Sequence, residues 1–227
     1  MAIKDLHIKK LQACLRSQAG VTLVEMVVVV AIVAVVSSVI IFNYSTFSTN
    51  ASVKSLAQQV ALSVRKAQAY ATSVRNIDNT STDTILYPAY GISFAVNQSG
   101  ATLASSKQFV LFADIPPSGS TIGDGKYTTN GTCGNPAFGS ECIETFTITS
   151  ADTIVQLCTN TSGTETCFSD KEVDIVFRRP SPDANVCLLV GGLCQVAKPA
   201  YAKVVLQSLK GGQKTITVWT TGQISVN

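Results

Sequence analysis

A long uncharged apolar run is the main hydrophobic feature of the chain. It covers residues 26–42 and contains neither glycine nor proline. With Leu23 and Val24 ahead of it, about 20 residues are apolar, which is the length that a helix needs to cross a bilayer. The pattern therefore predicts a membrane-spanning helix over residues 21–42. Glu25 lies in its first turn, where an ionised carboxylate in hydrocarbon costs several kcal/mol, so we expect Glu25 to have a cationic partner.

A second helical pattern follows this run. Residues 43–50 are rich in Ser, Thr and Asn, which compete for backbone hydrogen bonds and predict a kink or local melt. Beyond them, apolar positions recur at three- and four-residue steps, which is typical of a helix with one buried face. These positions are Val53, Leu56, Val60, Val64, Ala67, Ala71 and Val74. Because no glycine or proline lies between Val21 and Tyr87, one helix over residues 21–75 is allowed, about 80 Å long at 1.5 Å per residue.

Residues 76–227 change to short alternating runs rich in Thr, Ser, Val, Gly and Asn, which are typical of strands separated by turns. We predict strands at 90–96, 108–113, 145–149, 153–157, 173–177, 202–209, 215–220 and 223–226. A turn at Thr221-Gly222 joins the last two as a hairpin. Roughly 150 residues are enough for one domain with its own core. The sequence thus predicts an α+β fold, in which a long N-terminal helix packs on a β-rich head.

Positive charge precedes the apolar run. Residues 1–20 hold four of the 17 basic residues and one of the 14 acidic residues, a net charge of +3. Because positive flanks stay in the cytoplasm, we expect a single-pass protein of the cytoplasmic membrane, with the head outside the cytoplasm. Residues 21–227 hold 13 basic and 13 acidic residues, and this neutral balance gives no reason to propose nucleic acid or an acidic substrate.

Cysteine usage agrees with a head outside the cytoplasm. Of seven cysteines, Cys14 lies in residues 1–20, and six remain where disulfides persist. They form three close pairs with turn residues between them: Cys133/Cys142, Cys158/Cys167 and Cys187/Cys194. Closing such small loops contributes about 2.5 kcal/mol each in the chain-entropy model. Six cysteines allow 15 connectivities, of which the spacing favours this one, whereas no C-x-x-C spacing supports a metal site.

The sequence argues against an enzyme. The only histidine, His7, lies in residues 1–20, which leaves no Ser-His-Asp, Cys-His or histidine metal site in the rest. The segment 119–127 does not fit a phosphate loop, because its glycines are wrongly spaced and Tyr127 stands where Ser or Thr binds magnesium, so we expect a flexible turn. The segment 170–174 lacks the glycine and ligand spacing of a calcium loop and predicts a solvated acidic turn. We expect no metal and no cofactor.

The residues around Gly20 resemble the prepilin family, which comprises type IV pilins and type II secretion pseudopilins. Its members have a basic leader ending in glycine, then an apolar residue, Thr, two aliphatic residues, Glu and an unbroken apolar helix, and here Val21 replaces the usual Phe. The resemblance implies that residues 1–20 are a leader cleaved between Gly20 and Val21 by prepilin peptidase, with methylation of Val21. It implies Thr22 and Glu25 as assembly residues, with Glu25 paired to the N-terminal amine of a neighbouring subunit.

The implied partners are other pilin or pseudopilin subunits, prepilin peptidase, the inner-membrane assembly platform and membrane lipid. After assembly, the implied location is a cell-surface or periplasmic filament. Head motifs at 90–94 and 109–114 and the late Gly222 are similar to minor, H-type pseudopilins and to minor pilins. They are equally compatible with ordinary β core and turn glycines. The alternative from another class is a monomeric membrane-anchored domain that binds a ligand outside the cytoplasm.

Charge is unevenly distributed along the head. Residues 141–174 hold seven acids against Lys171, whereas residues 184–227 hold four lysines and no acid. We therefore expect a polarised head, whose acidic and basic faces meet between successive subunits. A second hypothesis is that the head of a minor pilin binds DNA, and the alternative to it is a set of solvated lysines. The candidate DNA or partner patch comprises Arg178, Arg179, Lys198, Lys203, Lys210 and Lys214.

Overall fold

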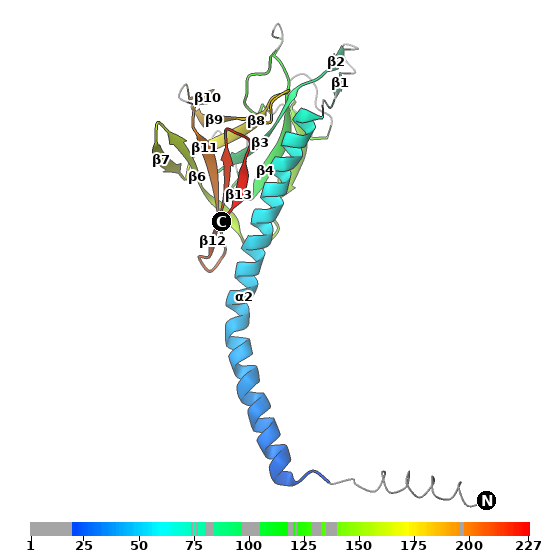
Figure 1. Cartoon of the computed structure of the whole chain (residues 1–227), viewed down its shortest axis with the longest axis vertical. Helices are drawn as coiled ribbons and strands as arrows, with labels where there is room; N and C mark the ends of the chain where they lie inside the picture. Colours follow the sequence, from blue (N-terminus) through cyan, green and yellow to red (C-terminus); the bar gives the residue numbers. More distant parts are fainter. Residues whose placement is uncertain are drawn as a thin grey trace, which may run out of the picture. The chain divides into compact units, whose positions relative to one another are not determined.

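One long helix begins the folded chain (Figure 1). The computed structural model describes residues 20–73, 75, 77–79, 84–96, 105–117, 120, 122–128, 133–134, 140–195 and 198–227. Helix α2 covers Leu23–Thr72. The chain divides into two units, Met1–Ser45 and Thr46–Asn227, so α2 contributes its first half to one unit and its second half to the other.

The local melt expected at residues 43–50 is not found, because α2 is helical throughout this segment. Hydroxyl groups are accommodated by donating to carbonyl oxygens of the preceding turn. The hydroxyl of Thr49, for example, donates to the carbonyl of Thr46 at 3.0 Å. The polar composition therefore changes the hydrogen bonding of side chains without ending the helix. The boundary between the two units also falls within residues 43–50.

The head is built from antiparallel strands (Figure 1). Within the described residues the strands are β1 (Ile77–Asn79), β2 (Thr84–Leu86), β3 (Ala89–Ala95), β4 (Gln108–Asp114), β5 (Cys142–Thr147), β6 (Thr153–Thr161), β7 (Thr164–Phe168), β8 (Glu172–Phe177), β9 (Ala184–Val190), β10 (Leu193–Cys194), β11 (Tyr201–Gln207), β12 (Gln213–Trp219) and β13 (Ile224–Val226). Six form a sheet in the order β10-β9-β8-β3-β4-β5, and five form a second sheet in the order β13-β12-β11-β6-β7. Strands β1 and β2 pair separately.

The second half of α2 and the two sheets share one hydrophobic core. The predicted apolar stripe of the helix is buried, with exposed fractions of 0–6 % at Val53, Leu56, Val60, Val64, Ala67 and Ala71. Val74 lies outside the described residues, and α2 ends at Thr72 rather than near Arg75. The stripe packs with inward-facing side chains of both sheets, among them Ile92, Leu111 and Ile216. The predicted α+β fold is therefore confirmed.

All eight predicted strands are present with shifted ends, and five strands were not predicted. Strands β1, β2 and β10 have only two or three residues, too few to show a period. Strand β7 reads TETCF and is mostly exposed, so its composition indicated a loop. The β12–β13 hairpin turns at Gly222, whose φ of +81° is unfavourable for other residues.

Three disulfides join the cysteine pairs that the spacing favoured. Their Cα atoms are 4.6 Å apart in Cys133–Cys142, 3.9 Å in Cys158–Cys167 and 5.2 Å in Cys187–Cys194. The second bond links directly opposed residues of β6 and β7, and the third links β9 to β10. Each disulfide therefore fastens a short strand or loop to a neighbouring strand of the head.

Leu56→Ala is expected to lower the free energy of unfolding by about 2–5 kcal/mol, because it leaves a cavity between α2 and the sheets. The matched control is Leu62→Ala in the same helix, since Leu62 is 68 % exposed and Leu56 only 6 %. We expect the control to change stability by less than about 0.5 kcal/mol. Urea unfolding of the full chain in detergent, followed by fluorescence of the single tryptophan, Trp219, measures both. Equal losses in the two variants would show that the helix face is wrongly assigned.

Candidate functional site

The segment before α2 has no regular secondary structure and is exposed. Gly20, Val21 and Thr22 precede the first helical residue, Leu23, and the side chain of Val21 is 62 % exposed. Thr22 caps the helix, because its hydroxyl accepts the N–H of Glu25 at 3.2 Å and its carbonyl accepts the N–H of Met26 at 3.1 Å. The helix therefore starts two residues after the Gly20–Val21 bond and leaves that bond accessible.

The first half of α2 presents apolar side chains all around. Large apolar residues between Val21 and Phe42 are 50–84 % exposed, and the side chain of Glu25 is also exposed. Within the described part of the chain, α2 is the one helix long and apolar enough to cross a membrane. An exposed apolar surface of this kind marks contact with a membrane or with other protein. These properties fit a single-pass, membrane-anchored protein.

The head contains a second polar feature, which the sequence did not predict. Five carboxylates are buried, with exposed fractions of 0–4 %: Asp114, Glu141, Asp152, Glu172 and Asp174. The expected solvated acidic turn at residues 170–174 is therefore wrong, because Glu172 and Asp174 belong to β8, whose residues are all buried. The carboxylate of Glu172 accepts the hydroxyl of Ser93 on the neighbouring strand at 3.0 Å. The sequence missed these sites because their charged residue types are mostly found exposed.

Several of these carboxylates hold the loop of residues 122–128 by its backbone. Glu141 accepts the N–H of Thr128 at 2.7 Å and, with its other oxygen, that of Ile115 at 3.0 Å. Asp114 accepts the N–H of Gly125, and Asp174 accepts that of Tyr127. The ring of Tyr127 is buried against Phe112, with ring centroids 5.4 Å apart. The described part of the predicted flexible turn is therefore anchored by hydrogen bonds and packing.

Burial sets the titration of this cluster. Removal from water raises the pKa of Glu141 to about 8, although two backbone N–H groups favour its ionised form. Burial also raises the pKa of Asp114, against a hydrogen bond from Gly125 and the opposing charge of Arg178. The pKa of Asp174 is raised well above its ordinary value by burial and by the neighbouring Glu172. The cluster therefore favours bound protons in the folded head.

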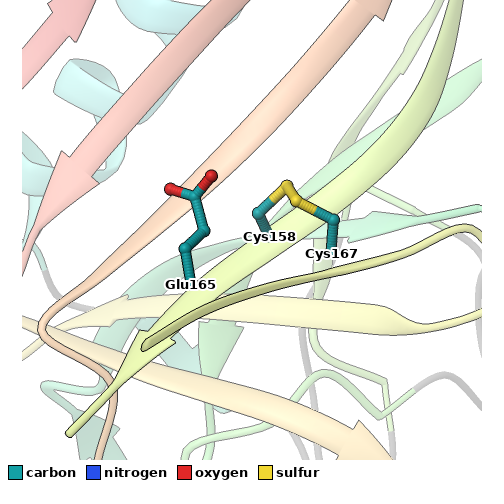
Figure 2. Close-up of side chains that lie close together, drawn as sticks. All are labelled: Cys158, Glu165 and Cys167. Carbon is teal, nitrogen blue, oxygen red and sulfur yellow. A yellow bond between two sulfur atoms is a disulfide. The ribbon is translucent and has the colours of Figure 1, made fainter. Parts of the chain in front are cut away.

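Two side-chain groups bring possible metal ligands within 4.8 Å of one another. The first comprises Asp114, Asp124 and Glu141, but Asp114 already accepts hydrogen bonds from the N–H of Gly125 and from Arg178, and Glu141 accepts the N–H groups of Ile115 and Thr128, so we assign no metal centre to it. The second is shown in Figure 2 and comprises Cys158, Glu165 and Cys167. Its sulfurs are bonded to each other and offer no thiolate, while Glu165 accepts hydrogen bonds from Lys203 and Tyr201.

The six residues of the candidate basic patch do not form one surface. Lys198 precedes β11 and Lys210 follows it, so strand length alone separates them by about 20 Å. Lys203 is paired with Glu165 at 2.6 Å, and Lys214 lies in β12 near its start. Lys210 and Lys214 lie close to each other at the β11–β12 turn, and Arg178 and Arg179 are adjacent after β8.

The expected polarised head is also wrong in its acidic half. Of the seven acids in residues 141–174, four are buried. The remaining three each have a nearby lysine: Glu144 pairs with Lys66, Glu165 with Lys203, and Asp170 with Lys171. The segment is therefore acidic in sequence but does not present an acidic face in the structure.

Comparison with known proteins places the N-terminal segment in a class. The prokaryotic N-terminal methylation motif matches residues 15–41. This match covers 27 of the 227 residues and supports the resemblance of the N-terminal segment to type IV pilins and pseudopilins. No curated protein and no solved structure matches the chain, so the comparisons do not support the H-type assignment of the head.

The raised pKa of Glu141 predicts a pH-dependent stability. The folded head binds more protons than the unfolded chain between the ordinary pKa of 4.5 and about 8. This contribution is fully present below the lower value and is lost as the pH rises through the upper one. We expect the free energy of unfolding to fall between pH 5 and pH 8, by up to about 1.4 kcal/mol per pH unit for one proton.

Glu141→Gln has no proton to lose at residue 141, so we expect it to reduce the slope of the free energy of unfolding against pH. Asp114 and Asp174, whose pKa values are also raised, should maintain part of this slope. The control is Glu144→Gln, the same change at a side chain that is 42 % exposed, which should leave the slope unchanged. Urea unfolding at a series of pH values measures both variants. A slope that is identical in wild type and Glu141→Gln would refute the assignment to Glu141.

Proposed function

We propose that this chain is a structural subunit of a type IV pilus or type II secretion filament. The observation that carries the proposal is the combination at the start of α2: an exposed Gly20–Val21 bond outside the helix, the Thr22 cap, Glu25 in the first turn, and an exposed apolar helix surface. The methylation motif at residues 15–41 supports the same conclusion.

The proposed route has three steps. The apolar segment 21–42 holds the precursor in the cytoplasmic membrane, with residues 1–20 inside and the head outside. Prepilin peptidase cleaves after Gly20, and the new amine of Val21 is methylated. The subunit then enters the filament through the assembly platform, and its apolar surface exchanges lipid for the helices of other subunits.

Glu25 has a specific role in this route. A carboxylate among apolar helices needs a cation, and among the described residues before Ser45 there is no Lys or Arg. Cleavage creates such a cation at Val21, and the methylated amine keeps its charge. Pairing of Glu25 with the amine of a neighbouring subunit satisfies both charges, and removal of one partner from a buried pair costs about 3–5 kcal/mol.

The first expected outcome concerns processing. The N-terminal mass of the protein, taken from membranes or shed filaments of its native host, should correspond to a chain that begins at methylated Val21. Gly20→Lys should leave the leader attached, because the peptidase no longer meets glycine at the junction. An intact leader in a host with a working prepilin peptidase would instead favour the monomeric membrane-anchored binding domain.

The second expected outcome concerns assembly. Glu25→Ala should leave membrane insertion intact but lower incorporation into filaments by about tenfold or more, because the neighbouring amine loses its partner. Ser38→Ala is a suitable control, since it removes another polar group from the same helix, a hydroxyl that bonds the carbonyl of Ala34. Immunoblots of membrane and sheared-filament fractions measure both. Normal incorporation of Glu25→Ala would end the proposed pairing.

A further inference from the structure

A small cavity lies at the end of the head where β3 begins and β8 ends. Its volume is about 170 Å³, which is below the range of about 300–1,000 Å³ typical of small-molecule sites. Two arginines (Arg178 and Arg179), the buried acid Asp114 and several apolar groups line it, the apolar groups including Tyr87, Pro88, Pro116 and Ile122. Since Asp114 is paired with Arg178, the two arginines leave one net positive charge at the cavity. The size and lining suit one side chain of another protein.

Arg178 is fixed in place by the buried acid beneath it. Its Nη2 group donates to Oδ2 of Asp114 and to the carbonyl of Gly123, each at 3.1 Å. The side chain of Asp114 is fully buried, whereas that of Arg178 is 45 % exposed. Both bonds leave from one nitrogen, and a guanidinium carries five N–H groups. The other N–H groups of Arg178 donate to no acceptor among the described residues, so they remain available to a ligand.

Arg179 is oriented in a different way. Its guanidinium carbon lies 4.9 Å from the centroid of the Tyr87 ring, a cation–π contact. Among the described residues its guanidinium makes no hydrogen bond and no ion pair. The ring supports the guanidinium through its face, which leaves the N–H groups at its edge available. Two positioned guanidinium groups therefore line the same cavity.

The geometry points to a binding site for one carboxylate. We propose that the cavity formed by Arg178, Arg179 and Tyr87 binds an Asp or Glu side chain of a partner protein. Planar guanidinium groups match a carboxylate through paired N–H···O bonds. Tyr87 and Ile122, which are 46 % and 59 % exposed, offer apolar contact to the residues beside that acid.

Nucleic acid fits the cavity less well. A nucleic-acid strand needs cations along a track that follows its phosphates. The lysines of the candidate basic patch lie before, within and after β11 and in β12, and none of them lines the cavity, so they do not extend the two arginines into such a track. A single carboxylate requires only the two arginines. The proposal is independent of filament assembly, because it concerns the head alone.

The test uses the full chain in detergent micelles, labelled with ¹⁵N-arginine. The sequence has five arginines, so the side-chain Nε–H signals are few, and Arg65 on the exposed face of α2 serves as an internal control. The probe is the blocked peptide acetyl-Ala-Leu-Glu-Leu-Ala-amide, and its matched control has Gln in place of Glu. We expect the Glu peptide to shift the signals of Arg178 and Arg179 in a saturable way, with no shift at Arg65 and none with the Gln peptide.

Variants distinguish binding at this cavity from general attraction between charges. Arg179→Gln should weaken binding of the Glu peptide by about fivefold, as expected for loss of one exposed ion pair, while Arg65→Gln should leave it unchanged. Asp114→Asn tests whether Asp114 holds Arg178 in the position that binds the peptide. If Asp114→Asn does not fold, the result for Arg179→Gln still decides the test. Equal shifts with both peptides, or equal effects of the two Arg→Gln variants, would overturn the proposal. Saturable binding of oligo(dT) at Arg178 and Arg179 without binding of the Glu peptide would overturn it in favour of phosphate.

Discussion

Helix α2 has to satisfy two environments with one continuous backbone, and the rest of the structure depends on this constraint. Its second half buries a stripe from Val53 to Ala71 in the core of the head. Its first half exposes apolar groups over its whole surface and holds one acid, Glu25. A soluble surface cannot tolerate such a segment, and lipid or other apolar helices can. Continuity through residues 43–50 means that both demands fall on the same helix.

The outer face of the six-stranded sheet carries buried carboxylates, which need hydrogen-bond donors. Sheets with one polar face normally leave that face in water. Here Asp114, Asp174 and Glu141 lie beneath the loop of residues 122–128, whose backbone N–H groups bind their oxygens. A buried backbone N–H needs an acceptor, and a buried carboxylate needs donors, so each satisfies the other. The loop and the acids are therefore one structural unit, in which Arg178 supplies a neutralising side-chain charge to Asp114.

The predictable parts of the molecule are those with a long period or a fixed spacing. The helical stripe from Val53 to Ala71 carried a strong signal, because its buried positions recur with the period of the helix. Strand β3 was predictable for another reason, since all of its residues are buried and most of them are apolar. Strand β7 carried no such signal, since it is exposed and is held by pairing with β6. At the N-terminus, the resemblance to prepilins, rather than any periodicity, singled out Gly20, Val21 and Glu25. The carboxylate cluster could not be predicted, because Asp114 comes from β4, Asp174 from β8 and Glu141 from the residue before β5, and the three become neighbours only through the fold.

The distribution of charge on the folded surface also could not be predicted from the sequence. By count, residues 21–227 are neutral, and the sequence suggested that acidic and basic faces hold subunits together. In the structure five acids are buried, whereas no lysine or arginine among the described residues is. The surface therefore presents more positive than negative groups, and like surfaces of this kind do not attract each other. In the proposed filament, the attraction between subunits would then come from the apolar surface of α2 and from Glu25. On the head, Arg178 and Arg179 are exposed and are held in place by Asp114 and Tyr87, which is why we propose them as the contact for an acidic side chain.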